Sequence, residues 1–316
     1  MFSVLKKVLF PALFAAGTAL CNAFEVPEEI SWWEEIYTPA RAAFMRGNNS
    51  VMPFYAYYAQ RLPASINKGG KLAASTYGTG VSLTHVSAEE DFIFLANMDY
   101  QRTDYRFSGT QNWSLPGEPF SHVDMLKVFN WTEYVYDREN GRAIAGMISG
   151  TLFSADSTSL SNGAHGAFAL GYKQYFSRTR SVWLGASVFY SRHRERWSVL
   201  PAMVLDFSLS REWNLRVGNG VELTWDIEGK DEWLISAGLS YGFDAITVGK
   251  GEVWYTQSAP LTLSVRRNIG KNFFVTAGVK TLLWTDYRLW ESGRETDAHF
   301  TVDPAVELSL QAGVRF

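Results

Sequence analysis

The sequence has almost no cysteine and, beyond its first twenty residues, no long apolar run. Its one cysteine is Cys21. A single cysteine cannot form an internal disulfide, and a thiolate metal site needs several. After residue 23 no segment approaches the ~18 consecutive apolar residues of a transmembrane helix. The pattern therefore excludes a bundle of membrane helices and leaves backbone pairing and apolar burial to hold the fold together.

The chain also lacks an excess of basic residues and any recognisable cofactor motif. Its 316 residues include 29 basic and 32 acidic side chains, for a net charge of −3. This balance gives no indication of nucleic-acid binding. Metal-ligand spacing, a glycine-rich phosphate loop and a paired-carboxylate arrangement do not stand out above chance. We therefore expect no metal, no cofactor and no nucleic-acid partner.

The N-terminus has the pattern of a cleavable secretory signal. Lys6 and Lys7 precede an apolar run without acidic residues, and small residues follow at Cys21 and Ala23. We expect residues 1–23 to be removed, which leaves 27 basic and 32 acidic residues and a net charge of −5. A start-anchored helix is one alternative, but the run is short of ~20 residues. A lipoprotein acylated at Cys21 is another, although Leu20 stands where such signals carry Gly, Ala or Ser.

The C-terminus alternates strictly between apolar and polar residues and ends on an aromatic. Apolar side chains occupy every second position from Val306 to Phe316, and the intervening residues are polar, charged or glycine. A strand with this pattern has one oily and one wet face. These last residues resemble bacterial outer-membrane β-barrel proteins. The resemblance implies that Phe316, Val314, Ala312 and Leu310 form the signal read by the barrel assembly machinery.

The same alternation recurs along the chain and predicts an all-β fold, an antiparallel transmembrane β-barrel. Hydrophobic residues make up 47% and the mean hydropathy is −0.11, because only alternate side chains of a barrel face lipid. An aromatic content of 15% suits interfacial girdles. We expect about twelve strands, near residues 72–84, 91–106, 123–136, 142–153, 165–176, 181–192, 201–210, 214–227, 232–244, 253–267, 272–287 and 302–316. The pattern also allows ten or fourteen.

Twelve strands leave a conflict in the lengths of the connections. The short polar turns at 177–180 and 210–213 fall on the same side as a long expected loop at 288–303. Further surface loops are expected at 85–91, 154–163, 191–201 and 244–259. A hairpin turn at Asn219-Gly220 would split the segment 214–227 and restore the parity. We expect this segment to form one strand because its apolar phase is unbroken and each half is shorter than the ~9 to 11 residues of a tilted span.

Charged residues on the second face of these strands suggest a polar lumen. The residues expected to face it are Asp99, Lys173, Asp206, Glu222, Lys280 and Glu307. The half-buried strands of a soluble β-sandwich are the alternative for any one segment.

Residues 24–70 do not alternate cleanly and are expected to form a separate N-terminal periplasmic or plug segment before a barrel at 71–316. Ile30, Trp33 and Tyr37 have helical spacing. We expect a short helix there, with a disordered leader as the alternative. Residues 53–58 could form an extra strand.

The nearest approach to catalytic chemistry is Ser161 with His165. Outer-membrane phospholipases and lipid A deacylases resemble this in having Ser-Asn near a catalytic histidine, but there the histidine stands two residues before the serine, where this chain has Ser159. In an extended strand, four residues span ~13 Å, which exceeds hydrogen-bond reach. We therefore expect no catalysis.

The sequence thus predicts a non-enzymatic barrel of the bacterial outer membrane. It would be either a narrow pore for small solutes or a closed barrel whose loops bind a partner. A lipid hydrolase and a soluble secreted β-sandwich are the alternatives. Outer-membrane lipid and lipopolysaccharide are the expected surroundings. The basic stretches 178–180 and 193–197 could contact lipopolysaccharide, although solvated loop charge is the favoured interpretation.

Overall fold

The computed structural model describes residues 50–51, 53–87, 91–110, 119–156, 163–177, 180–191, 194–210, 212–218, 220–227, 232–249, 251–270 and 272–315. The secretory signal, the helix expected near Ile30, Ser161 and Phe316 all lie outside these residues. The described residues contain no α-helix and form one antiparallel sheet.

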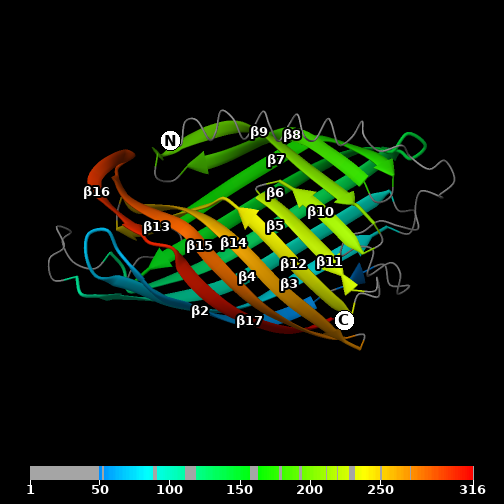
Figure 1. Ribbon diagram of the computed structural model, residues 1–316. Helices are drawn as coiled ribbons and strands as arrows, with labels where there is room; N and C mark the ends of the chain where they lie inside the picture. Colours follow the sequence, from blue (N-terminus) through cyan, green and yellow to red (C-terminus); the bar gives the residue numbers. More distant parts are fainter. Residues whose placement is uncertain are drawn as a thin grey trace.

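The sheet consists of consecutive strands that each follow the previous one around the barrel (Figure 1). The strands are β1 (Ser50–Val51), β2 (Pro53–Ser65), β3 (Lys71–Val86), β4 (Phe92–Ser108), β5 (His122–Asp137), β6 (Arg142–Ala155), β7 (Gly163–Ser177), β8 (Arg180–Ser191), β9 (Arg196–Ser208), β10 (Trp213–Val217), β11 (Gly220–Asp226), β12 (Trp233–Ser240), β13 (Gly242–Gly249), β14 (Glu252–Ile269), β15 (Phe273–Glu291), β16 (Arg294–Val302) and β17 (Ala305–Arg315).

These strands close into a barrel of fourteen wall strands. The last strand, β17, pairs with β2, and β9 pairs with β10, so the sheet returns on itself. At three places one wall strand is divided into two segments, so the extra segment does not add a strand to the wall. The short β1 continues β2 along β3, β12 and β13 pair with successive parts of β14, and β16 and β17 pair with successive parts of β15.

The expected count of twelve is therefore wrong, and both missing strands lie at places where the sequence was ambiguous. One is β2, inside the range 24–70 that was assigned to a separate N-terminal segment. The other arises from the turn at Gly218–Gly220, which splits 214–227 into β10 and β11. The register pairs Leu215 with Leu223 and Val217 with Val221. Both arms thus present their apolar residues on one face, and the alternation does not reveal the turn.

The added turn removes the conflict in connection lengths. The short turns after β7, β9 and β14 now lie at one end of the barrel together with Arg315, which we call the C-terminal end. The turns after β2, β13 and β15 lie at the opposite end, which we call the far end. Most of the residues expected as long loops at 191–201, 244–259 and 288–303 are strands, namely the start of β9, β13 with the start of β14, and the end of β15 with β16.

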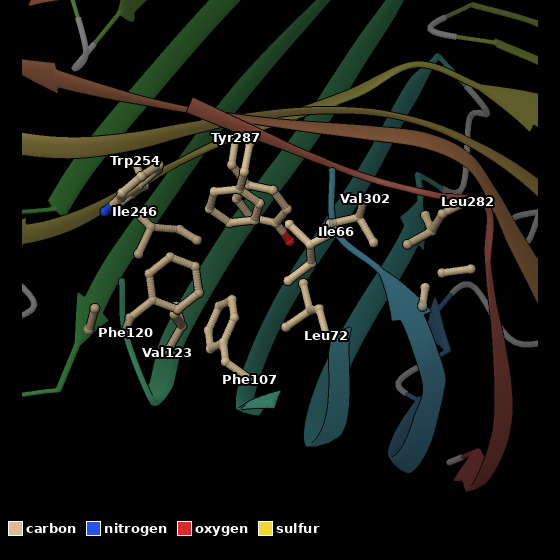
Figure 2. Packing of buried hydrophobic residues seen from close by; sticks show 14 of the residues in the cluster. Ile66, Leu72, Phe107, Phe120, Val123, Ile246, Trp254, Leu282, Tyr287 and Val302 are labelled. Carbon is tan, nitrogen blue, oxygen red and sulfur yellow. The ribbon is translucent and has the colours of Figure 1, made fainter. Parts of the chain in front are cut away.

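The main hydrophobic core fills the interior at the far end. Its rings come from opposite walls: Phe107 on β4 lies 6.2 Å from Phe300 on β16, and Phe120 before β5 lies 6.3 Å from Tyr287 on β15. Figure 2 shows Phe107, Phe120 and Tyr287 between the β14–β16 wall above and the β3–β5 wall below. Ile246 and Trp254 also belong to this cluster. We call it the apolar plug.

Among the described residues, no helix is long and apolar enough to cross a membrane.

Candidate functional site: the barrel wall and lumen

The outward positions of the wall strands carry large apolar side chains without protein contacts to cover them. Ile148 is 59% exposed, Leu263 51% and Leu310 55%. Soluble monomers rarely expose apolar patches of more than a few hundred Å². This surface instead continues around the barrel, with exposed members on almost every strand, including Phe54, Tyr58, Tyr77, Met98, Val128, Tyr134, Ile144, Phe168, Leu170, Tyr172, Leu184, Val221, Leu239, Leu261, Phe273, Val279 and Leu308. It fits a hydrocarbon environment.

The described residues of the expected assembly signal, Leu310, Ala312 and Val314, lie on this outer surface. Leu310 pairs with Tyr58 on β2 and with Ala277 on β15, and Ala312 and Val314 follow in the same phase. Their packing is that of ordinary wall residues. Their recognition by assembly machinery stays a prediction, and Phe316 lies outside the described residues.

On β2 to β4, the inward face carries a hydrogen-bonded ladder of polar side chains. Tyr57 donates its hydroxyl to Asp99 Oδ1 at 3.0 Å, and Tyr55 donates to Asp99 Oδ2 at 3.1 Å. The rings of the two tyrosines cross over β3, where Gly78 and Gly80 lie beneath them and a Cβ would overlap the rings. The glycines thus allow the tyrosines on β2 to reach a carboxylate two strands away.

A row of charged side chains lies on the same inward face across β15, β17 and β2. Glu307 on β17 is the register partner of Lys280 on β15 and of Arg61 on β2. Lys280 Nζ contacts Glu307 Oε1, and Arg61 Nε lies 3.5 Å from Glu307 Oε2. The apolar plug lies near this row, because Ala305 and Leu282, the inward residues two positions along β17 and β15, belong to it. Two basic groups therefore share one largely buried carboxylate.

A second ion pair lies on the opposite wall. Lys173 on β7 donates to Glu133 Oε2 at 2.8 Å, and the carboxylate also accepts hydrogen bonds from Tyr175 and from Trp131. The Glu133 side chain is only 1% exposed. Lys173 is expected on this face from the sequence, whereas Glu133 is not among the expected residues. The signal was present, because Glu133 has the same strand phase as Met125, Lys127 and Trp131, but the aromatic residues on both sides of it hid the alternation.

The remaining two residues expected in the lumen lie near one another at the short hairpin. Asp206 accepts a hydrogen bond of 3.1 Å from Asn214. Arg216 on β10 lies between Asp206 on β9 and Glu222 on β11 in the register. The register therefore places all six expected residues on one continuous inward face, but it distributes them over four separate groups. Their role in conduction stays a prediction.

The far end of the lumen is narrowed by β13. This strand pairs with β14 along one edge and leans across to contact β6 and β7. His165 on β7 donates through Nε2 to the backbone carbonyl of Ala245 at 3.0 Å, and its ring packs edge-on against Phe153. His165 therefore joins β13 to the opposite wall, together with the apolar plug.

The expected absence of catalysis at Ser161 and His165 stays a prediction, because Ser161 lies outside the described residues. Among the described residues, no group of three or more His, Cys, Asp or Glu side chains could hold a metal ion.

Comparison with known proteins gives likenesses of overall shape only. No family model matches the chain, and no curated protein matches it. Among solved structures, it is similar to an outer membrane channel from Pseudomonas putida F1, with a TM-score of 0.47, 8% identity and coverage of 84% of this chain and 95% of that one. It is similar to the toluene transporter TodX from Pseudomonas putida, with a TM-score of 0.42, 9% identity and coverage of 90% and 94%.

A third similar structure is the translocator domain of the autotransporter NalP from Neisseria meningitidis. Here the TM-score is 0.39 at 13% identity, with coverage of 89% of this chain and 99% of that one. With TM-scores below 0.5, these likenesses do not assign the chain to a family.

Proposed function

We propose that the protein is an integral barrel of the bacterial outer membrane that acts as a narrow, non-enzymatic pore for small solutes. The observation that carries this proposal is the division of the wall into an exposed apolar outer face and an inner face with ion pairs and tyrosine–carboxylate hydrogen bonds. In lipid an unpaired backbone group is costly, and the strand ladders of a closed antiparallel barrel pair most of these groups within the protein.

The size of the barrel supports a pore over a solid core. Eight-stranded barrels have an interior that side chains just fill, whereas barrels of 16 to 18 strands leave a water channel. Fourteen strands lie between these limits. The lumen near Asp99 and Lys280 is lined by polar groups, and the apolar plug with β13 forms the constriction at the far end.

The arrangement of charge further suggests weak ion selectivity. Acidic and basic side chains alternate around the lumen, as in Lys173 with Glu133 and Arg216 between Asp206 and Glu222. Selective pores use rings of charge of one sign. We therefore expect similar permeability for K⁺ and Cl⁻.

Planar-bilayer conductance tests the pore. The wild-type protein should give small conductance steps, and Phe300→Ala, which removes a ring from the apolar plug, should enlarge them. Phe273→Ala removes an equivalent ring from the outer face and serves as the matched control with unchanged steps. If neither the wild type nor Phe300→Ala conducts ions, the pore is contradicted, and the protein is instead a closed barrel whose loops bind a partner.

The proposal includes the surroundings that an outer-membrane location implies. Both described ends of the barrel sheet, at Ser50 and Arg315, lie at the C-terminal end, which would face the periplasm. Of the two basic stretches, Arg194 and Arg196 lie at the far end and could meet lipopolysaccharide, whereas Arg180 lies at the C-terminal end. Barrel assembly machinery would insert the chain.

An enzymatic barrel is tested separately. Purified protein in mixed micelles should not hydrolyse phospholipid or lipid A. Hydrolysis that disappears in Ser161→Ala would replace the pore by a lipid hydrolase.

A further inference from the structure

The wall of the barrel has a gap above the short β10–β11 hairpin. β9 pairs with β10 only from Leu205 to Ser208. Within the described part of the chain, the edge of β9 from Arg196 to Val204 that faces away from β8 has no strand beside it. On the other side of the gap, β12 is paired with β11 as far as Ser240, and β13 then leans inward. We call this opening the β9 gap.

The β9 gap lies at the level of the apolar outer band. Val199 on β9 is 66% exposed and points outward, and Val221 and Leu239, exposed on the outer face of β11 and β12, border the gap on its other side. Trp197, two residues before Val199 on the same face, is 65% exposed, and its ring lies 5.4 Å from that of Tyr190 in a tilted arrangement. Tryptophan and tyrosine mark the interface of a barrel's apolar band, so the gap between them and the hairpin faces hydrocarbon.

The edge of β9 is poorly suited to accept another strand. Pro201 lies in the middle of the unpaired stretch and has no backbone N–H to donate. Proline in a sheet is confined to edges and bulges, where it discourages edge-to-edge pairing. A strand of a second copy or of a partner protein would therefore lose a ladder hydrogen bond at the centre of its contact.

Behind the gap, the inner face is apolar. The register pairs Leu200 with Ser187 on the inward face of β8, yet Leu200 is 52% exposed, so no described side chain covers it. The next inward residues, Ala202 and Val204, pack against the buried cluster around Trp183. At the far side, Phe243 of β13 lies 6.4 Å from Phe189, another inward residue of β8. An apolar surface therefore continues from the outer band, through the gap, to the inner wall.

We propose that the β9 gap is a binding site for a lipid acyl chain, which lies against Leu200 and completes the wall. A hydrocarbon chain matches the apolar lining on both sides of the gap and does not require the backbone donor that Pro201 lacks. It would also contact the apolar side chains of the inner wall at Ala202 and Val204, away from the charged row at Glu307. This inference rests on the proposed membrane location, because the surrounding medium supplies the chain.

Nitroxide accessibility in vesicles of palmitoyl-oleoyl phosphatidylcholine tests the site. The only cysteine is Cys21, which belongs to the segment expected to be removed, so single-cysteine variants can be labelled cleanly. Leu200→Cys reports on the gap, Leu239→Cys on the outer face, and Ser264→Cys on the inner face of the intact wall between β12 and β15. The measured quantity is the ratio of collision with dissolved oxygen to collision with a water-soluble nickel chelate.

The ratio at Leu200 should match that at Leu239 and exceed that at Ser264 several-fold, although register places Leu200 and Ser264 on the same inward face. If the ratio at Leu200 equals that at Ser264 while the ratio at Leu239 is high, as expected in lipid, the acyl-chain site alone is overturned. Exclusion of both reagents from Leu200 also overturns it, because a protein segment then covers the gap. A water-like ratio at Leu239 overturns the proposed membrane location itself. Ala202→Cys provides a second reporter should Leu200→Cys refold poorly.

Discussion

Lys173 and Glu133 form an ion pair of 2.8 Å between two strands that are not neighbours, β7 and β5, with β6 passing between them. The pair can cross β6 because the register places Ala143 and Ala145 there, and both are fully buried. Small residues on the middle strand thus let long charged side chains meet above it, as Gly78 and Gly80 do for Tyr57 and Asp99.

We predict that removing one partner of this ion pair lowers the free energy of unfolding more than replacing both partners does. Glu133→Gln should lower the free energy of unfolding by about 3 to 5 kcal/mol, because Lys173 then keeps a buried, uncompensated charge. The double variant Glu133→Gln with Lys173→Met should recover part of the loss. Urea unfolding in lipid vesicles measures both. Additive losses in the double variant would show that the two side chains do not interact.

We predict that Phe300 contributes more to stability than any single exposed wall residue. Its ring is fully buried, stacks on Tyr287 at 4.5 Å and lies 5.5 Å from Trp254. Phe300→Ala should cost about 3 to 5 kcal/mol of unfolding free energy, the usual range for deletion of a buried aromatic. Phe300→Leu, which keeps most of the volume, should cost less. An equal, small loss in both variants would mean that the apolar plug is not tightly packed.

The turn after β5 should respond to acid. Hydrogen bonds from the side chain and backbone of Asn140 hold the pKa of Asp137 below its ordinary value of 3.8. A lowered pKa means that this carboxylate stabilises the turn above pH 3.8 and that the contribution is lost as the pH falls through the lower, folded pKa. Carbon-13 NMR of the carboxyl carbon in micelles should give a midpoint below 3.8, which moves upward in Asn140→Ala. A midpoint at or above 3.8 in the wild type would contradict the hydrogen-bonded turn.

The general architecture was predictable from sequence because a membrane barrel imposes a period of two on its lipid-facing residues. This period marked most wall strands and the inward phase of residues such as Asp99 and Lys280. It failed for β2, where aromatic side chains occupy both faces: Phe54 and Tyr58 point outward, while Tyr55 and Tyr57 reach Asp99 inside.

The two-residue alternation of apolar side chains does not indicate several other features of the fold. The turn at Gly218–Gly220 preserves the phase across the hairpin, so it was passed over. The sequences of β13 and β16 do not alternate cleanly, so most of their residues were expected to be loops. The partnership of Glu133 with Lys173 depends on which strands lie two apart in the sheet, which a single sequence does not reveal.

The central claim is that one face of each wall strand lies in hydrocarbon and the other in a wet lumen, and neighbouring residues on β14 test it most directly. Leu263 points outward and is 51% exposed, while Ser264 points inward. An arginine near the middle of a barrel's lipid face costs about 2 to 4 kcal/mol. Refolding into lipid vesicles should show a loss of this size for Leu263→Arg and a much smaller one for Ser264→Arg. Equal losses, or a larger loss for Ser264→Arg, would contradict the assignment of the faces and with it the membrane barrel.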